Sequence, residues 1–308
     1  MQTEQPRRDN LYYAANLIGL AVLVYLAVSA LLQTALAALL AALPGIPAWG
    51  TALANCAVTA ADLAAPLLCL RHWAAPLGLP PLRLQRPHRE AALIGLPLFL
   101  CFTTLCGVAA NLVRMLLDLG GYVPPQTMRL PEGGALVLSF LSVCLIPAVG
   151  EELLFRGTIQ KLLSPYGGWF SIIVSSLFFT LLHPDLSQLP SIFAMSLFLG
   201  YVAAASGSVA NTILLHFANN TSSFLLLWSR QQMDGTNAMA FSAVLFTLYF
   251  AAGLLALLAL IRRGGPRRLP RYPTRRNRMG RTERILPAPF FTFTLLLLVL
   301  TDLLEYFR

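Results

Sequence analysis

The sequence predicts an all-α fold: a polytopic transmembrane helix bundle of eight or nine spans. Of the 308 residues, 57% are hydrophobic and only 11% are charged, whereas an ordinary soluble domain has about 25% charged residues. Apolar runs of about 20 residues, long enough to cross the hydrocarbon core of a bilayer as a helix, recur along the chain. Together these observations exclude a water-soluble domain.

Nine apolar runs are expected to form the helices, with ends defined to within a few residues. Pro44 and Pro47 separate the first run from the second, and a loop rich in Pro and Arg at 71–90 precedes the third. The first run is much longer than the apolar part of a secretory signal, so we expect it to stay attached. The last run is expected either to cross the membrane as a ninth span or to lie partly in its interface. The runs cover residues 11–43, 49–70, 91–117, 133–163, 169–183, 189–206, 208–229, 237–261 and 286–304.

Basic residues predict how these helices are oriented, because Lys and Arg concentrate on the cytoplasmic side of membrane proteins. When the spans are counted in order, Arg7, Arg8, the loop at 71–90 and the segment Arg262–Arg284 all fall on the same side. We therefore expect an integral protein of the bacterial cytoplasmic membrane with its N-terminus in the cytoplasm.

The segment Arg262–Arg284 holds ten arginines and one glutamate, an excess equal to the net charge of +9 of the whole chain. Its Pro and Arg content predicts a basic cytoplasmic linker that contacts anionic lipid head groups. Binding to nucleic acid is not expected, because arginines that directly follow a membrane helix are typical of a cytoplasmic boundary.

Three ionisable residues stand close together in the middle of the apolar run 133–163, and each costs roughly 2.5–3.5 kcal/mol in a membrane when it has no partner. They stand in the sequence Gly150-Glu151-Glu152-Leu153-Leu154-Phe155-Arg156-Gly157. Glu152 and Arg156 are four residues apart, so they share a helix face and can form an ion pair. Glu151 lies about 100° further round the helix without a full partner, which makes it a candidate proton acceptor. Alternatively, all three residues only hold this helix to its neighbours.

Two histidines also lie in apolar runs. His183 follows Phe179 by four residues, so the aromatic ring can wall the imidazole, and Pro184 ends the helix just beyond it. His216 and Asn220 share a helix face in the same way, and they suit hydrogen bonding to a small polar target such as an oxyanion. Either histidine alone is explained as a core residue that bonds across helices. Two glutamates, two histidines and an asparagine on three helices instead favour a functional site.

Two kinds of chemistry are open to this set. Glu151, assisted by His183, could deprotonate a water molecule while His216 and Asn220 stabilise the oxyanion formed on an amide. Alternatively, His183, His216 and a glutamate such as Glu151 could hold a divalent metal such as zinc, with the other glutamate as base. From these residues alone, a metal site and a site without a cofactor both remain open.

Three motifs in this region resemble those of the CAAX protease and bacteriocin-processing (CPBP) intramembrane peptidases, also called the type II CAAX prenyl endopeptidase family. The family patterns E-E-x-x-x-R, F-x-x-x-H and H-x-x-x-N/D correspond here to Glu151-Glu152-x-x-x-Arg156, Phe179-x-x-x-His183 and His216-x-x-x-Asn220. The resemblance implies a hydrolase, an intramembrane protease with a four-helix catalytic core at residues 133–230.

The same resemblance implies the roles of the site residues. Glu151 would be the water-activating base and would act with His183, while Glu152 and Arg156 would support them. His216 and Asn220 would form the oxyanion site. The family is commonly named a metalloprotease family, and a metal-free glutamate mechanism is also argued for it; we favour the glutamate mechanism.

The segments outside the core match no family motif. Residues 1–117 are expected to form N-terminal membrane helices, 237–261 a further membrane helix and 285–308 a C-terminal apolar segment. We expect the substrate to be a membrane protein or peptide, prenylated or not. Two other functions stay open: a proton-coupled transporter that uses the buried Glu, His and Arg residues together with Asp62, and a catalytically inert immunity or scaffold protein.

Overall fold

The computed structural model describes residues 10–82, 84, 86–125, 127–266, 268–269 and 285–306, and every regular element in these ranges is a helix. The predicted all-α class is therefore confirmed. In chain order, the elements are α1 (Asn10–Ala42), α2 (Ala48–Ala74), η1 (Ala75–Leu77), η2 (Ala91–Gly95), α3 (Leu96–Asp118), α4 (Gly134–Phe140), η3 (Leu141–Leu145), α5 (Ile146–Leu154), η4 (Phe155–Ile159), α6 (Gln160–Leu163), η5 (Ser164–Tyr166), α7 (Gly168–Leu181), α8 (Leu189–Ser206), α9 (Val209–Gln232), α10 (Gly235–Arg262) and α12 (Pro289–Tyr306).

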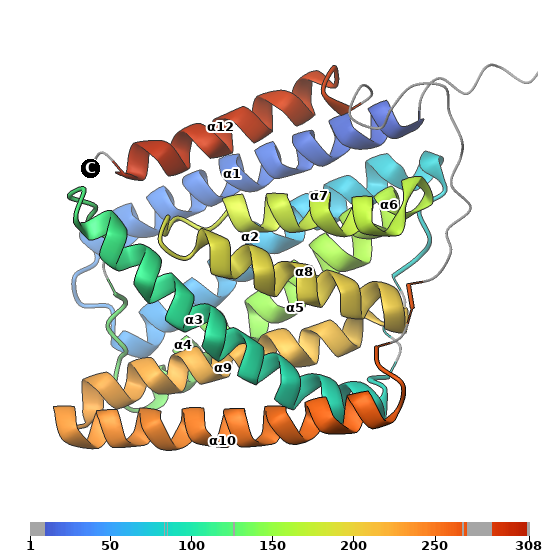
Figure 1. Cartoon of the computed structure of the whole chain (residues 1–308). Helices are drawn as coiled ribbons and strands as arrows, with labels where there is room; N and C mark the ends of the chain where they lie inside the picture. The colour runs from blue at the N-terminus through green and yellow to red at the C-terminus, as the bar shows by residue number, and fades with distance from the viewer. Residues whose placement is uncertain are drawn as a thin grey trace, which may run out of the picture.

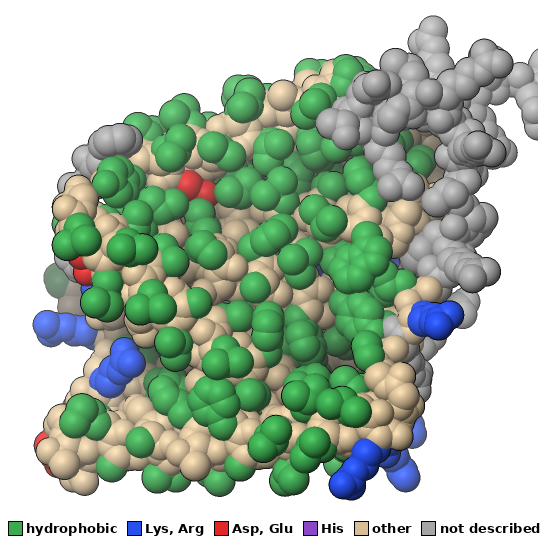
Figure 2. Space-filling view, viewed as in Figure 1, with side chains coloured by type: hydrophobic (Ala, Val, Ile, Leu, Met, Phe, Trp, Pro, Cys, Tyr) green, Lys and Arg blue, Asp and Glu red, His purple; other side chains and the backbone are tan. Residues whose placement is uncertain are grey.

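The helices have the length and the surface of membrane spans. Six stretches of helix are long and apolar enough to cross a bilayer, and α7 and α12 are apolar but shorter. Large hydrophobic side chains are exposed over the outer faces of the helices, and Lys and Arg side chains stand near the two sides of the view (Figure 2). These features define an integral membrane protein, and the number of eight or nine spans stays a prediction. The six stretches are Asn10–Ala42, Ala48–Leu77, Ala91–Asp118, Gly134–Tyr166, Leu189–Ser206 and Gly235–Arg262.

Successive helices cross the bundle in alternate directions, so the links between them gather at two opposite ends (Figure 1). We call one the basic end; it carries the α2–α3 link, the turns at 164–168 and 207–208 and the C-terminal end of α10. We call the other the distal end; it carries the links at 43–47, 119–133, 182–188 and 233–234. Most of the predicted linker 262–284, from residue 270 onwards, lies outside the described residues, as do Arg7 and Arg8.

The helix that carries the two glutamates runs continuously through α4, η3, α5 and η4, with two π-helical turns. The first turn precedes Pro147, whose missing N–H and bulky ring cannot continue regular bonding to the carbonyl of Val143. The second turn begins at Phe155, directly after the glutamates, and contains Arg156. Single π-helical turns are frequent at functional sites because they redirect side chains.

This central helix is enclosed on both sides. α5 packs between α2 and α9, while α3, α8 and α10 cover α9 and α1 covers α2. α12 lies alongside α1 at the edge of the bundle (Figure 1). The side chains of α5 consequently face other helices rather than lipid, which is the environment that buried charged groups in a membrane require.

The contact between α1 and α12 depends on Gly19. A Cβ atom on Gly19 would overlap the backbone of Phe290 and Phe291. Two hydrogen bonds flank this close approach: Phe290 N–H donates to Asn16 Oδ1 at 3.1 Å, and the Thr294 hydroxyl donates to the Gly19 carbonyl at 3.1 Å. Small residues that let helix backbones approach are typical of membrane helix pairs.

Gly19→Ala is expected to lower the free energy of unfolding by about 1–3 kcal/mol, because the added methyl group forces α12 away from α1 and weakens both hydrogen bonds. Thermal unfolding in detergent measures this loss. Gly107→Ala is the matched control, since no atom lies within 4 Å of the new Cβ there. Equal unfolding temperatures for the two variants would show that α12 does not pack on α1 in this way.

Candidate active site

A buried ionic cluster of Glu152, Arg156 and His216 lies at the centre of the bundle. Arg156 Nη1 donates to Glu152 Oε1 at 2.8 Å, as the spacing of four residues predicts. The His216 ring reaches the same oxygen from α9, with Nδ1 at 2.9 Å. All three side chains are almost completely buried. Because a buried charge is stable only with partners, the cluster links α5 and η4 to α9.

The guanidinium of Arg156 also reaches α8 and α7. Its Nη2 donates to the hydroxyl of Ser196 at 2.8 Å and to the carbonyl of Ser196 at 3.2 Å. Its Cζ lies 4.5 Å from the centroid of the Phe179 ring, a cation–π distance. Ser196 was not predicted from the sequence, since a serine in an apolar run is common and nothing in its spacing relates it to Arg156.

The contacts of the two histidines define which ring nitrogen carries a proton. His183 Nδ1 lies 2.8 Å from the Phe179 carbonyl, which can only accept, so Nδ1 donates and, in the neutral ring, Nε2 is the acceptor. His216 Nδ1 likewise donates to the Glu152 carboxylate. The Nε2 atom of each histidine is therefore available for a different partner, such as water or a substrate. The Phe179 ring contacts both imidazoles, with centroid distances of 4.9 Å to His183 and 5.9 Å to His216.

Glu151 lies beside this cluster without belonging to it. Its Oε2 atom is 3.8 Å from His216 Nε2, too far for a hydrogen bond, and it makes no hydrogen bond to another described side chain. The side chain remains 20% exposed, whereas that of Glu152 is 0% exposed. Of the two glutamates, Glu151 is therefore the one that water can reach.

The main cavity, with a volume of about 520 Å³, brings the remaining site residues together. Glu151, His183, His216 and Asn220 all line it. The Asn220 amide donates to the Val143 carbonyl at 3.5 Å, which is a long hydrogen bond. This carbonyl is the one that Pro147 leaves without its regular helical partner. Other polar residues that line the cavity were not predicted from the sequence; they are Thr103, Gln188, Ser191, Asn219 and Ser223.

A second cavity of about 170 Å³ lies on the other side of Glu151 and His183, and we call it the rear cavity. Tyr25 of α1 and Leu63 of α2 help to wall it. Its size is sufficient for several water molecules. Glu151 and His183 therefore stand between two spaces, one on each side.

His183 lies on a structured loop rather than on a helix. α7 ends at Leu181, two residues before the predicted end, and the loop 182–188 follows. Asp185 holds this loop: it accepts hydrogen bonds from Tyr122 at 3.1 Å and from Gln188 at 2.6 Å. Partial burial alone would raise the pKa of Asp185. Hydrogen bonds from Ser187, Gln188 and Tyr122 outweigh this effect and lower the pKa below its ordinary value. The carboxylate thus stays ionised at neutral pH and keeps the loop in place.

The predicted metal ligands do not form a metal site as they are placed here. In the part of the chain that the structure describes, no group of three or more His, Cys, Asp or Glu side chains is arranged to hold a metal ion. Each histidine bonds through Nδ1, to Glu152 or to the Phe179 carbonyl, and leaves Nε2 for another partner. As they are placed, Glu151, His183 and His216 are not grouped around one point as ligands of a metal ion, and we derive no step through one.

The fold and this site together define an integral membrane protein with a polar cavity, lined by ionisable residues, inside its helix bundle. Residues 133–222 match the model of a family described as type II CAAX prenyl endopeptidase Rce1-like. The chain therefore carries an Rce1-like domain, the domain of a family of membrane proteases, and the resemblance seen in the motifs is confirmed. All six predicted site residues fall inside the matched range. No curated protein and no solved structure matches the chain significantly.

Proposed function

We propose that this protein is an intramembrane endopeptidase that hydrolyses a peptide bond of a membrane-associated protein or peptide with a water molecule activated by Glu151 and His183. The observation that carries the proposal is the convergence of these two residues with His216 and Asn220 on one cavity inside the bundle. The Rce1-like domain supports the reaction class.

In the proposed mechanism, the attacking water lies between the Glu151 carboxylate and Nε2 of His183. Glu151 takes a proton from the water, and the hydroxide oxygen forms a bond to the carbonyl carbon of the substrate. When the C–N bond breaks, Glu151 returns that proton to the leaving nitrogen. The products are a carboxylic acid and an amine, and the site regains its starting state. The rear cavity supports this proposal because it can hold water beside both residues.

His216 and Asn220 are the proposed donors to the oxyanion. With Nδ1–H bound to Glu152, a doubly protonated His216 has its Nε2–H free to donate toward the main cavity. Asn220 lies one helical turn further on, and its long bond to the Val143 carbonyl is easily exchanged for a bond to substrate. A hydrogen-bond donor that is already in position when the negative charge develops raises kcat by roughly 10²–10³-fold.

Glu152 and Arg156 are proposed as positioning residues rather than as bases. Glu152 is completely buried and already accepts from Arg156 and His216. It orients the His216 ring and stabilises its positive charge, while Arg156 neutralises Glu152. A doubly protonated His216 and an ionised Glu151 would complete a set of two positive and two negative charges, which limits the cost of burial.

Cleavage of a peptide library by the purified protein in detergent tests the proposed function. We expect cleavage that persists with EDTA and with 1,10-phenanthroline, because the described residues of the site are not grouped as the ligands of one metal ion. Loss of activity with both chelators and its return with zinc would contradict the glutamate mechanism. Glu151-dependent proton flux in proteoliposomes without any cleavage would instead establish a carrier.

The position of Asp62 does not favour the alternative of a proton relay. Asp62 accepts a hydrogen bond from Ser29, and it lines neither the main cavity nor the rear cavity.

We further propose that the basic end faces the cytoplasm. Of the 22 lysines and arginines, seventeen belong by sequence to the segments before α1, around the α2–α3 link, near the 164–168 turn or from Arg262 to Arg284. Four others adjoin distal segments, and Arg156 is buried. Such an asymmetry is the usual determinant of orientation. The arginines from Arg262 onwards would contact anionic lipid head groups on that side.

A further inference from the structure

The main cavity reaches the distal end of the bundle. Its lining includes Met128 from the 119–133 link and Gln188 from the 182–188 loop, both of which are distal-end segments. These residues are exposed, Met128 to 41%, whereas His216 at the inner end of the cavity is 3% exposed. The cavity therefore becomes more open from the site residues toward the distal end.

Toward the basic end, an apolar plug closes the cavity. Phe99 of α3, Leu199 of α8 and Leu215 of α9 form one packed cluster, and each is 0% exposed. On all three helices the plug residue lies beyond the cavity lining on the side of the basic end: Leu215, for example, immediately precedes His216. Among the described residues, these three packed apolar side chains form the boundary of the main cavity toward that end.

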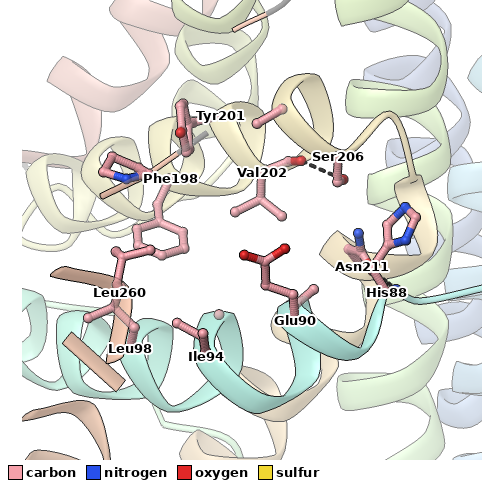
Figure 3. A pocket seen from close by; sticks show the side chains of 14 residues that line it. His88, Glu90, Ile94, Leu98, Phe198, Tyr201, Val202, Ser206, Asn211 and Leu260 are labelled. Carbon is pink, nitrogen blue, oxygen red and sulfur yellow. Dashed lines mark hydrogen bonds between the residues drawn. The ribbon is translucent and has the colours of Figure 1, made fainter. Parts of the chain in front are cut away.

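A separate cavity lies on the other side of the plug (Figure 3). It has a volume of about 210 Å³, and its walls include Ile94 of η2, Val202 of α8 and Leu260 of α10. Figure 3 shows the Glu90 carboxylate pointing into it, with His88 and Asn211 near one side. Among the described residues that line it, none is a predicted site residue. The space at the basic end thus does not lead to Glu151.

We infer that substrate enters from the distal end, which is the extracytoplasmic side if the basic end faces the cytoplasm. This inference deepens the proposed peptidase function and rests on it. The substrate class is then a peptide segment exposed at the outer surface of the membrane, such as the juxtamembrane part of an exported or membrane-anchored protein. A chain end presented only from the cytoplasm would meet the plug rather than the cavity.

Cys106 is a native probe of this route, because it lines the main cavity. A variant that retains Cys106 alone carries Ala at the other four cysteines, Cys56, Cys69, Cys101 and Cys144. Intact bacterial cells are treated with a charged, membrane-impermeant thiol reagent, and labelling is followed by gel shift. We expect Cys106 to react without permeabilisation.

Three single-cysteine variants serve as controls. Each is made in a background in which all five native cysteines are replaced by Ala. Val108→Cys places a thiol on the same helix but outside the cavity, where Val108 is 54% exposed on the outer surface. It should react at least roughly tenfold more slowly than Cys106, since a thiol in hydrocarbon stays protonated. Thr127→Cys marks the distal end and should react in intact cells. Arg263→Cys marks the basic end and should react only after permeabilisation.

Labelling does not require catalysis, so it separates this inference from the proposed function. If Cys106 reacts only after permeabilisation, together with Arg263→Cys, the cavity opens to the cytoplasm and the inference is wrong. If Arg263→Cys reacts in intact cells, the orientation is inverted, and the inferred substrate class at the outer surface is wrong. Failure of Cys106 to react under either condition would show that water does not fill the cavity. Labelling as expected without any peptide cleavage would keep the route and refute the peptidase.

Discussion

Glu151→Gln is expected to lower kcat by about 10²–10⁴-fold, the usual contribution of a positioned general base. The substitution preserves the shape of the side chain but removes its ability to accept a proton from water. The neighbouring Glu152 cannot replace it, because Glu152 is fully buried and both Arg156 and His216 donate to it. KM should change little, since Glu151 is proposed to contact the water rather than to bind the peptide.

Glu132→Gln is the matched control for this experiment. Glu132 is an exposed glutamate next to the 133–163 run and is not part of the described cavity lining. Its substitution should leave kcat unchanged, and both variants should unfold at nearly the same temperature as wild type. If Glu151→Gln retains more than about one tenth of the wild-type kcat while folding normally, Glu151 is not the general base.

Local spacing predicted the parts of the site that lie on one helix. Glu152 and Arg156 meet because residues four apart share a helix face. Phe179 contacts the His183 ring as predicted, although His183 lies just beyond the end of α7. The nine apolar runs likewise marked the helices, because length and composition determine whether a segment can cross a bilayer. Helix ends were less well predicted: α7 ends before His183, so that this residue belongs to the loop that Asp185 holds.

Contacts between distant segments could not be predicted in the same way. Glu152 and His216 are 64 residues apart, and no sequence pattern states which ring nitrogen faces which carboxylate. Ser196 was missed because a small hydroxyl in an apolar run has little sequence signal. The cavity itself depends on how α3 crosses α8 and α9, and α3 contributes Thr103 and Cys106, whose chemistry alone does not suggest a site. Such features follow from tertiary packing.

The ionic cluster provides the largest expected effect on stability. Arg156→Met is expected to lower the free energy of unfolding by about 3–5 kcal/mol, the usual cost of removing one partner from a buried pair. Methionine fills a similar volume, so the loss arises mainly from the Glu152 carboxylate, which is 0% exposed and would lose its arginine partner while keeping His216 and Thr212. Thermal and denaturant unfolding in detergent measure the change.

The double variant Glu152→Gln with Arg156→Met separates charge from packing. It removes both members of the pair, so no uncompensated charge remains, and it should recover most of the stability lost in Arg156→Met. Its catalytic activity should nevertheless stay low, because a neutral glutamine no longer stabilises a positive charge on His216. Recovery of stability without recovery of activity would show that the cluster serves the chemistry of His216. A double variant as unstable as Arg156→Met would instead show that Arg156 acts through its contacts with Ser196 and Phe179.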